Sequence, residues 1–275
     1  MNEAIAPLRR RGRPASASSE ASGDVQSLDR AMGLLEVLAP TDGLSLSELA
    51  RQAELPPSTV HRLLTTLSRR GLVSHDPATG LWAVGLGLFR IGSAYLRNRK
   101  LPEIARPILK QLQAQVGETV NVSMLDRTEL VCVAQSESHA PVRAFFRLGW
   151  RLPLHASAAG KAVLAAGSEG LQQELLQTIG WDPFTSNTFT TKEALLAEVA
   201  RVRRRGWAID DEEYTIGMRC ASAAIRNEWA EPIGAISVSA PTVRMPINRV
   251  DVLGECVQDA AATLSELFSG RKPGA

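Results

Sequence analysis

Hydroxyl and basic side chains recur at helical spacing between Pro57 and Arg70. At 100° per residue, Val60 and the leucines of this segment share one face. The opposite face and its flanks carry the side chains that we expect to contact DNA: Ser58, Thr59, His61, Arg62, Thr65 and Arg69. No acidic residue occurs from Leu55 to His75. Because hydroxyl and guanidinium groups hydrogen-bond base edges and phosphates, this segment predicts nucleic-acid recognition.

A second cluster of positive charge lies in residues 1–23, a stretch rich in Ser, Ala and Pro that predicts a flexible arm. Its sequence Arg11-Gly12-Arg13-Pro14 has the form of an AT-hook core, in which arginines read the negative potential of the minor groove. A basic tail without sequence preference is the alternative, and the two remain level. Both predict phosphate contacts by Arg11 and Arg13 and a salt-dependent gain in DNA affinity.

Two further helices and a hairpin are expected to position the DNA-contacting segment. Ser45 and Glu48 form a capping box, Pro57 suits a first helical turn, and Gly71 supplies a left-handed stop. The expected elements are helices over Val25–Leu38, Leu46–Ala53 and Pro57–Arg70 and strands over Leu72–His75 and Leu81–Val84. Residues 24–84 therefore predict a winged helix-turn-helix, with a tri-helical dimerisation or protein-binding module as the less favoured alternative.

A basic connector follows the predicted hairpin. Residues 85–116 contain six basic side chains and one acidic side chain, and their apolar spacing predicts helices over Gly85–Asn98 and Pro102–Val116. The positive charge fits contacts with flanking DNA or the solvated side of a dimer-forming connector, and we favour the second. We assign residues 85–100 to a linker helix.

The hydrophobic periods change in residues 101–270, where strands and helices mix. The expected strands are Thr119–Leu125, Leu130–Ala134, Val142–Phe146, Cys220–Ile225 and Ile233–Val238. The expected helices are Ala158–Ala166, Glu169–Thr178, Glu193–Arg205 and Ile247–Phe268. This pattern predicts an α+β domain with one central, largely antiparallel sheet and flanking helices.

Groups for chemistry are sparse in this second domain. No motif brings His155 to Cys220 as a nucleophilic pair, and the run from Asp210 to Glu213 is expected to be a solvated loop. The segment Pro153–Lys161 is more suggestive, because its small residues open a helix whose bare amides can hold a small carboxylate. Close packing of that helix on the sheet is the alternative, which the segment alone leaves open.

The composition fits a folded globular protein, with 44% hydrophobic and 22% charged residues in 275. No apolar run approaches the roughly 18 residues of a membrane span. Three separated cysteines and four histidines give neither a disulfide framework nor metal-ligand spacing, so we expect a cytoplasmic protein without metal or cofactor. The net charge of +2 hides a basic arm and connector beside a mildly acidic second domain.

Several separated motifs, in one order, resemble the signatures of IclR-type bacterial transcription regulators. They are Val25–Ala31, Ser58–Leu64, Leu152–Ser157, Gly160–Ala162, Gly206–Glu213, Gly217–Cys220 and Ala235–Pro241. The resemblance runs from about Asp24 to Phe268. It implies a winged helix-turn-helix, a helical linker and a GAF-like effector domain, assembled as a homodimer or a dimer of dimers on a palindromic operator.

Within this family, the resemblance is strongest to the glyoxylate-sensing regulators, whose effectors are glyoxylate and pyruvate. Matching their pocket residue by residue implies an effector site formed by Leu152, Ala158, Ala159, Asp210, Met218 and Cys220. The Ala158 and Ala159 amides would hold the carboxylate, and Asp210 and Cys220 would meet the carbonyl end. Ala158 replaces a glycine, Ala144 and Met218 replace other apolar residues, and Phe145 and Phe146 are departures that would narrow the pocket or join the sheet core.

The resulting prediction is a DNA-binding regulator, repressor or activator, controlled by a small 2-oxo acid. An activator of aromatic-acid catabolism is the first alternative. An enzyme using Cys220 or His155 is a weaker one, because no base, nucleophile and orienting group can be assembled from the sequence. Reversible addition of Cys220 to the glyoxylate aldehyde is a further variant.

Overall fold

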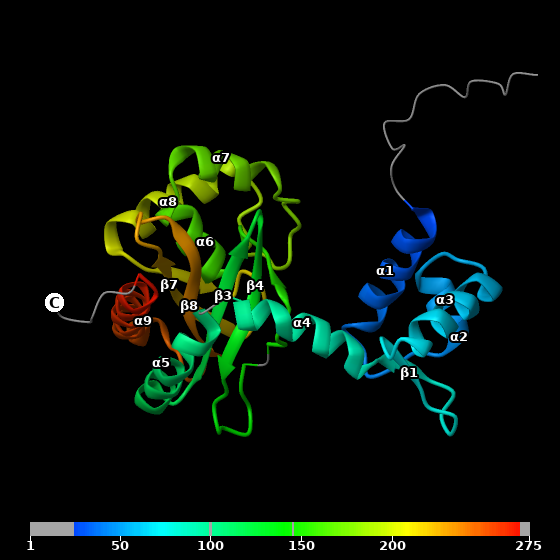
Figure 1. Cartoon of the computed structure of the whole chain (residues 1–275). Coiled ribbons are helices and arrows are strands. Elements are labelled where there is room, and N and C mark those ends of the chain that lie inside the picture. Colours follow the sequence, from blue (N-terminus) through cyan, green and yellow to red (C-terminus); the bar gives the residue numbers. More distant parts are fainter. Residues whose placement is uncertain (1–24, 99–100, 145, 270–275) are drawn as a thin grey trace, which may run out of the picture. The chain divides into compact units, whose positions relative to one another are not determined.

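A computed structural model describes residues 25–98, 101–144 and 146–269 (Figure 1). The predicted contacts of Arg11 and Arg13 lie outside the described residues. The chain divides between Tyr95 and Leu96 into two compact units. None of the helices in the described ranges is long and apolar enough to cross a membrane.

The first unit has the predicted order of three helices and a hairpin, followed by a fourth helix that runs across the division. Its elements are α1 (Gln26–Leu38), α2 (Leu46–Gln52), α3 (Pro57–Arg69), β1 (Val73–His75), β2 (Trp82–Val84) and α4 (Leu86–Asn98). β1 and β2 pair antiparallel. Leu44, just before α2, adds an isolated bridge to Trp82, which ties the hairpin to the loop between the first two helices.

Local sequence signals fix the ends of these helices. Ser45 Oγ accepts from the Glu48 amide while the Glu48 side chain accepts from the Ser45 amide, which is the predicted capping box. Pro57 occupies the first turn of α3. Leu34, Leu49 and other apolar side chains of the three helices are fully buried, and each contributes roughly 1.5–3 kcal/mol to folding.

The second unit is an antiparallel sheet with helices on both faces, as predicted. Its elements are α5 (Leu101–Val116), β3 (Thr119–Asp126), β4 (Glu129–Ser136), β5 (Arg151–Leu152), α6 (Ala158–Ala166), α7 (Glu169–Gln177), α8 (Lys192–Arg205), β6 (Ala208–Asp211), β7 (Met218–Arg226), β8 (Pro232–Pro241) and α9 (Ile247–Phe268). The strand order is β5-β4-β3-β8-β7-β6, and each neighbouring pair is antiparallel.

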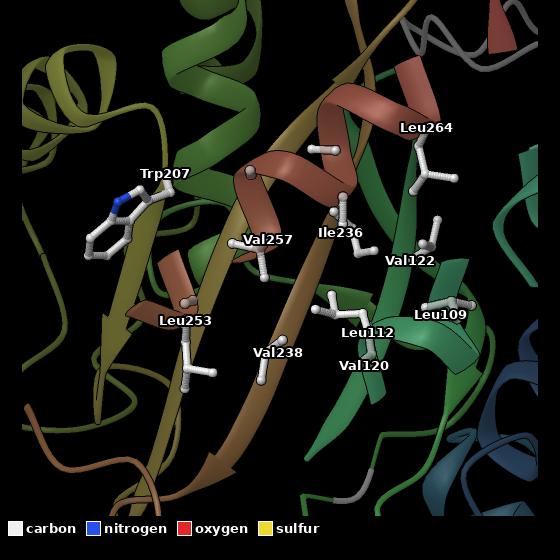
Figure 2. Packing of buried hydrophobic residues seen from close by; sticks show 14 of the residues in the cluster. Leu109, Leu112, Val120, Val122, Trp207, Ile236, Val238, Leu253, Val257 and Leu264 are labelled. Atoms are coloured by element: carbon white, nitrogen blue, oxygen red, sulfur yellow. The ribbon is translucent and has the colours of Figure 1, made fainter. Parts of the chain in front are cut away.

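Alternation along the central strands separates an apolar face of the sheet from a polar one. Val120 and Val122 of β3 pack under α5 and α9 together with Ile236 and Val238 of β8 (Figure 2). Because successive strand side chains point to opposite faces, the intervening Asn121, Ser123, Ser237 and Ser239 lie on the face that α6 covers. The larger hydrophobic core therefore lies on one side of the sheet and a polar layer on the other.

Two expectations for the second unit were wrong. The described residues of Val142–Phe146 form no strand, because both edges of β3 are occupied by β4 and β8 and β5 pairs with the outer edge of β4. The predicted solvated loop from Asp210 to Glu213 begins as strand β6, and the side chains of Asp210 and Glu213 are buried. β5 and β6, with two and four residues, were too short to stand out in the sequence.

Candidate functional site

The exposed face of α3 carries the predicted DNA-contacting residues. Five of them are exposed and Thr59 is half-buried, whereas Val60, Leu64 and Leu67 are buried on the other side of the helix. The exposed residues are Ser58, His61, Arg62, Thr65 and Arg69. The structure thus brings the predicted set together on one continuous helix face.

The two arginines of this face are free to take a ligand. Within residues 25–98, neither Arg62 nor Arg69 forms an ion pair with an acidic side chain. Thr65 Oγ1 donates to the carbonyl of His61 at 2.7 Å, so its oxygen is left as an acceptor. The face therefore offers guanidinium donors and a hydroxyl acceptor to whatever approaches α3.

The tip of the β1-β2 hairpin carries an acidic side chain and no cationic one. Asp76 accepts from the amide of Ala78 at 2.9 Å and from Oγ1 of Thr79 at 2.7 Å, and these bonds lower the pKa of its carboxyl. No lysine or arginine occurs from Leu72 to Gly85. Phosphate contacts by the hairpin would therefore use backbone amides or His75 rather than a cationic side chain.

A small cavity lies between the polar face of the sheet and the beginning of α6. The volume open to the centre of a water-sized sphere is about 20 Å³. Its walls come from the four inner strands β3, β4, β7 and β8, the edge strands β5 and β6, the beginning of α6 and the neighbouring loops. The lining residues are Asn121, Ser123, Cys132, Phe146, Leu152, Ser157, Ala158, Ala159, Asp210, Tyr214, Cys220, Ser237 and Ser239.

One hydroxyl in this wall lacks a partner. Ser123 is 1% exposed, and its Oγ has no hydrogen bond to any described residue. Asn121 is also buried, but its Oδ1 accepts from Nε2 of Gln135 at 2.9 Å. A buried hydroxyl without a partner costs about 1–3 kcal/mol, so Ser123 is satisfied more favourably when a ligand or water enters the cavity.

The first turn of α6 supplies two further free donors. Ser157 caps the helix, because its Oγ accepts from the amide of Gly160 at 3.0 Å. The structure gives no acceptor in the described residues to the amides of Ala158 and Ala159, as expected for a first helical turn. Their N–H groups and the helix dipole create a position for an anion at the cavity wall.

Gly160 allows the close approach that forms this turn. A Cβ at this position would lie 2.5 Å from both the Cα and the carbonyl oxygen of Leu154. No larger residue fits without moving the backbone before α6. The sequence left two explanations open for the small residues of the Pro153–Lys161 segment, and both apply. Gly160 packs closely against Leu154, and the amides of Ala158 and Ala159 are left without an acceptor in the described residues.

A buried charge cluster adjoins the cavity. Lys161 is 0% exposed, and its Nζ bonds to both carboxylate oxygens of Glu213. Asp210, which is 4% exposed, accepts from the amides of Glu213 at 2.8 Å and Tyr214 at 3.3 Å. Burial raises the pKa of Asp210 to about 6 and that of Glu213 to about 7, against the opposing effect of Lys161.

Cys220 and His155 do not form a nucleophilic pair. Burial raises the pKa of the Cys220 thiol, and the nearby Asp210 raises it further, so the thiol stays protonated and weakly nucleophilic. His155 lies outside the lining of this cavity and contacts the carbonyl of Asp182 at 3.1 Å and the ring of Phe184. The cavity therefore holds a protonated thiol without the histidine base that an enzyme using these two residues would need.

The structure brings five of the six residues predicted for the effector site to the cavity wall. These are Leu152, Ala158, Ala159, Asp210 and Cys220, whereas Met218 is not among the lining residues. Phe146 lines the cavity, Ala144 is buried elsewhere, and Phe145 lies outside the described residues. The described part of the chain holds no group of three or more metal-ligating side chains.

Sequence reasoning missed the polar layer of the sheet and the neighbouring loop. The missed lining residues are Asn121, Ser123, Cys132, Ser157, Tyr214, Ser237 and Ser239. A signal was present: Ser237 and Ser239 alternate with Ile236 and Val238 in a strand that is otherwise apolar. Polar residues at every second position of a central strand indicate a polar layer on that face of the sheet.

Comparison with known proteins places both units in one family. The model of the bacterial transcriptional regulator IclR C-terminal region matches residues 93–266, and the IclR helix-turn-helix model matches residues 27–77. The chain is 41% identical to the HTH-type transcriptional regulator BhcR of Paracoccus denitrificans, covering 96% of both chains. It is 40% identical to the transcriptional repressor IclR of Escherichia coli K12, covering 97% of this chain and 98% of that one.

A solved structure agrees with the fold. An IclR homolog of Microbacterium hydrocarbonoxydans, complexed with 4-hydroxybenzoate, superposes with a TM-score of 0.74 at 26% identity and covers 89% of this chain and 99% of that one. The similar proteins are regulators with a helix-turn-helix and not enzymes. The predicted fold class is thereby confirmed at the level of the whole architecture.

Proposed function

The chain belongs to the IclR family of bacterial DNA-binding transcriptional regulators, and from that premise we propose that glyoxylate or pyruvate, bound in the α6 cavity, controls its affinity for operator DNA. In this proposal residues 24–84 bind the operator, residues 85–100 connect, and residues 101–270 form a GAF-like effector domain. The protein acts on operator DNA in the cytoplasm.

The observation that carries the effector proposal is the chemistry of the small cavity. The amides of Ala158 and Ala159 fit a carboxylate, and the unpartnered hydroxyl of Ser123 fits an additional acceptor such as an oxo oxygen. Asp210 and Cys220 lie in the same wall. A 2-oxo acid carries a carboxylate and an oxo oxygen on adjacent carbons. These two groups match the amide donors and the hydroxyl donor, which line one small cavity. Met218, two residues before Cys220 on the same face of β7, remains part of the proposed site although it does not line the cavity.

The size of the cavity favours a 2-oxo acid over an aromatic acid. The solved relative with 4-hydroxybenzoate makes aromatic acids the natural competitor. A free volume of about 20 Å³ is close to the roughly 10–15 Å³ that one water needs, so an aromatic ring would have to displace wall residues such as Phe146. Glyoxylate, the smallest 2-oxo acid, needs the least displacement.

Calorimetric titration of the full chain with glyoxylate, pyruvate and 4-hydroxybenzoate tests the assignment. We expect saturable heat with the two 2-oxo acids and weaker binding in Ser123→Ala, by about tenfold, because a hydrogen bond is removed. Ser222→Ala is the matched control: Ser222 is a buried serine of β7 whose Oγ donates to the carbonyl of Ile236, outside the cavity. Binding of 4-hydroxybenzoate with no heat from either 2-oxo acid would transfer the protein to the aromatic-acid branch.

The DNA-contacting surface in this proposal is the exposed α3 face. Its residues are Ser58, Thr59, His61, Arg62, Thr65 and Arg69, with Arg11 and Arg13 of the arm adding phosphate or minor-groove contacts. Arg62 lies in the middle of α3, and we assign its guanidinium group to hydrogen bonds with a base edge.

A homodimer, or a dimer of such dimers, fits the first unit. α1 exposes Leu28 and Met32, at 60% and 50%, and α4 exposes Phe89 and Ile91, at 68% and 63%. Large apolar side chains gathered on two helices favour burial by a second copy of the chain. Two copies would present two α3 helices to the half-sites of a palindromic operator.

A further inference from the structure

The buried charges beside the cavity do not balance. Lys161 Nζ bonds to both oxygens of Glu213, which uses the ammonium group as the counter-ion of that carboxylate. The two amide donors of Asp210 both reach Oδ1, and no described residue donates to its Oδ2. Asp210 lines the cavity and forms no ion pair with a described residue, so this carboxyl group is the one that a ligand meets.

No second cation in the described residues compensates Asp210. The charged or titratable side chains around it are Asp211 on β6, Arg219 and Cys220 on β7, Lys161 on α6, and Glu212, Glu213 and Tyr214 in the following loop. Arg219 is paired with Asp211, its Nη2 lying 2.6 Å from Oδ1.

The helices α8 and α9 do not change this balance. α8 reaches the cluster through the apolar Val202, while its Arg201 and Arg205 pair with Glu198. α9 packs with Ile209, whose side chain lies on the other face of β6. Among the described residues, one ammonium therefore serves two buried carboxyl groups. Burial raises the pKa of both carboxyls, which then titrate as a coupled pair holding less than its full charge near neutral pH.

A 2-oxo acid adds a further negative charge to this site. Pyruvate is an anion at neutral pH and offers acceptors alone, its carboxylate and its oxo oxygen. An ionised Asp210 has no proton to donate and repels such a ligand, whereas a protonated Asp210 donates from Oδ2. The free amides of Ala158 and Ala159 supply the remaining donors for the anion.

We propose, resting on the effector assignment above, that Asp210 binds the 2-oxo acid as a neutral carboxylic acid and that the protein takes up one proton from solvent with each anion. At pH 8, where the free pair is ionised, the proton forms a bond to Asp210 Oδ2 and is donated in a hydrogen bond to an acceptor of the ligand, while both oxygens of Glu213 stay bonded to Lys161. The net charge of the site is then the same before and after binding. Asp210 is thereby a specificity residue that selects ligands with an acceptor at this position.

Calorimetry with pyruvate on the full chain tests the proton uptake directly. Pyruvate is the better probe because hydrated glyoxylate carries hydroxyl donors that an ionised carboxylate accepts. At pH 8, titrations in two buffers of different ionisation enthalpy should give an uptake of about one proton per site. The dissociation constant should rise about tenfold per pH unit above the free-site pKa. Binding with no uptake and no pH dependence overturns the inference and leaves the effector assignment standing.

Two neighbouring variants separate Asp210 from general effects of pH. Asp210→Asn keeps a donor in place, so we expect binding that no longer depends on pH and no proton uptake. Asp211→Asn, one position along β6, is the matched control and should keep the wild-type uptake. A folded Asp210→Asn protein that retains the wild-type pH slope, or that loses binding at every pH, contradicts a neutral Asp210. Absence of binding of both pyruvate and glyoxylate to the wild-type chain at every pH overturns the effector assignment itself.

Discussion

The exposed face of α3 and the cavity beside α6 hold charge in opposite ways. Arg62 and Arg69 are exposed and form no ion pair with any described residue, whereas Lys161 and Glu213 are buried and bonded to each other. Solvated charges cost the fold little and attract a charged polymer at long range, with strong salt dependence. Buried charges are expensive unless paired, and they select a ligand by hydrogen-bond geometry and size. Substitutions on the exposed face of α3 should therefore change the free energy of unfolding little. Substitutions of the buried charges beside the cavity should change it strongly.

The largest effect expected from this contrast is on stability. Lys161→Met leaves Glu213 buried without its cation, so we expect the second unit to lose about 3–5 kcal/mol in free energy of unfolding. Arg69→Ala, on the exposed face, should change stability by less than about 0.5 kcal/mol. Urea titrations of both variants, followed by circular dichroism, measure the difference.

A double variant separates the cost of the unpaired carboxylate from the loss of the lysine side chain. Adding Glu213→Gln to Lys161→Met removes the stranded carboxylate and should recover part of the lost stability. Equal, small losses in Lys161→Met and Arg69→Ala contradict the distinction between the two regions.

The next effect concerns DNA affinity. Arg62→Ala should weaken operator binding by about 1–3 kcal/mol if its guanidinium contacts a base edge, and it should relax specificity at that base pair. Heats of effector binding should not change, because Arg62 belongs to the other unit. Fluorescence anisotropy with an operator selected from random sequence measures the loss. Undiminished specific binding by Arg62→Ala removes this residue from base readout.

The smallest effect is expected from the basic arm. Replacing Arg11 and Arg13 by alanine should lower the slope of log affinity against log salt by about 0.9 for each phosphate that the arm no longer neutralises. A preference for A·T-rich flanks that disappears in this variant supports minor-groove reading, while a change in slope alone supports a non-specific tail. An unchanged slope shows that the arm does not touch DNA.

The exposed face was predictable because a single helix carries it. The 3.6-residue period set Val60 and Leu64 against Arg62 and Arg69, and the expected helix ends one residue from the observed α3. Tertiary context was not needed to tell which side faces solvent.

The cavity was predictable in part, because strands, a helix and loops far apart in the chain contribute to it. The helix start at Ala158 was visible from its small residues, but Ser123 and Ser239 were hidden in strands read for their apolar content. The four acidic residues from Asp210 to Glu213 have the composition of a solvated loop. The cation that pairs with the buried Glu213 is Lys161, which lies on another element, α6. Local composition therefore predicted exposed side chains, whereas contacts with residues distant in the sequence bury Asp210 and Glu213.

We propose that a small 2-oxo acid in the cavity changes the affinity of the α3 face for DNA. The most direct test is operator affinity of the full chain, measured by anisotropy at fixed pH and salt with and without saturating pyruvate. A coupling between two sites of one regulator predicts a change of about 5- to 150-fold, abolished in a folded cavity variant that no longer binds pyruvate. An operator affinity that stays the same while calorimetry shows pyruvate bound contradicts control of DNA binding by this effector.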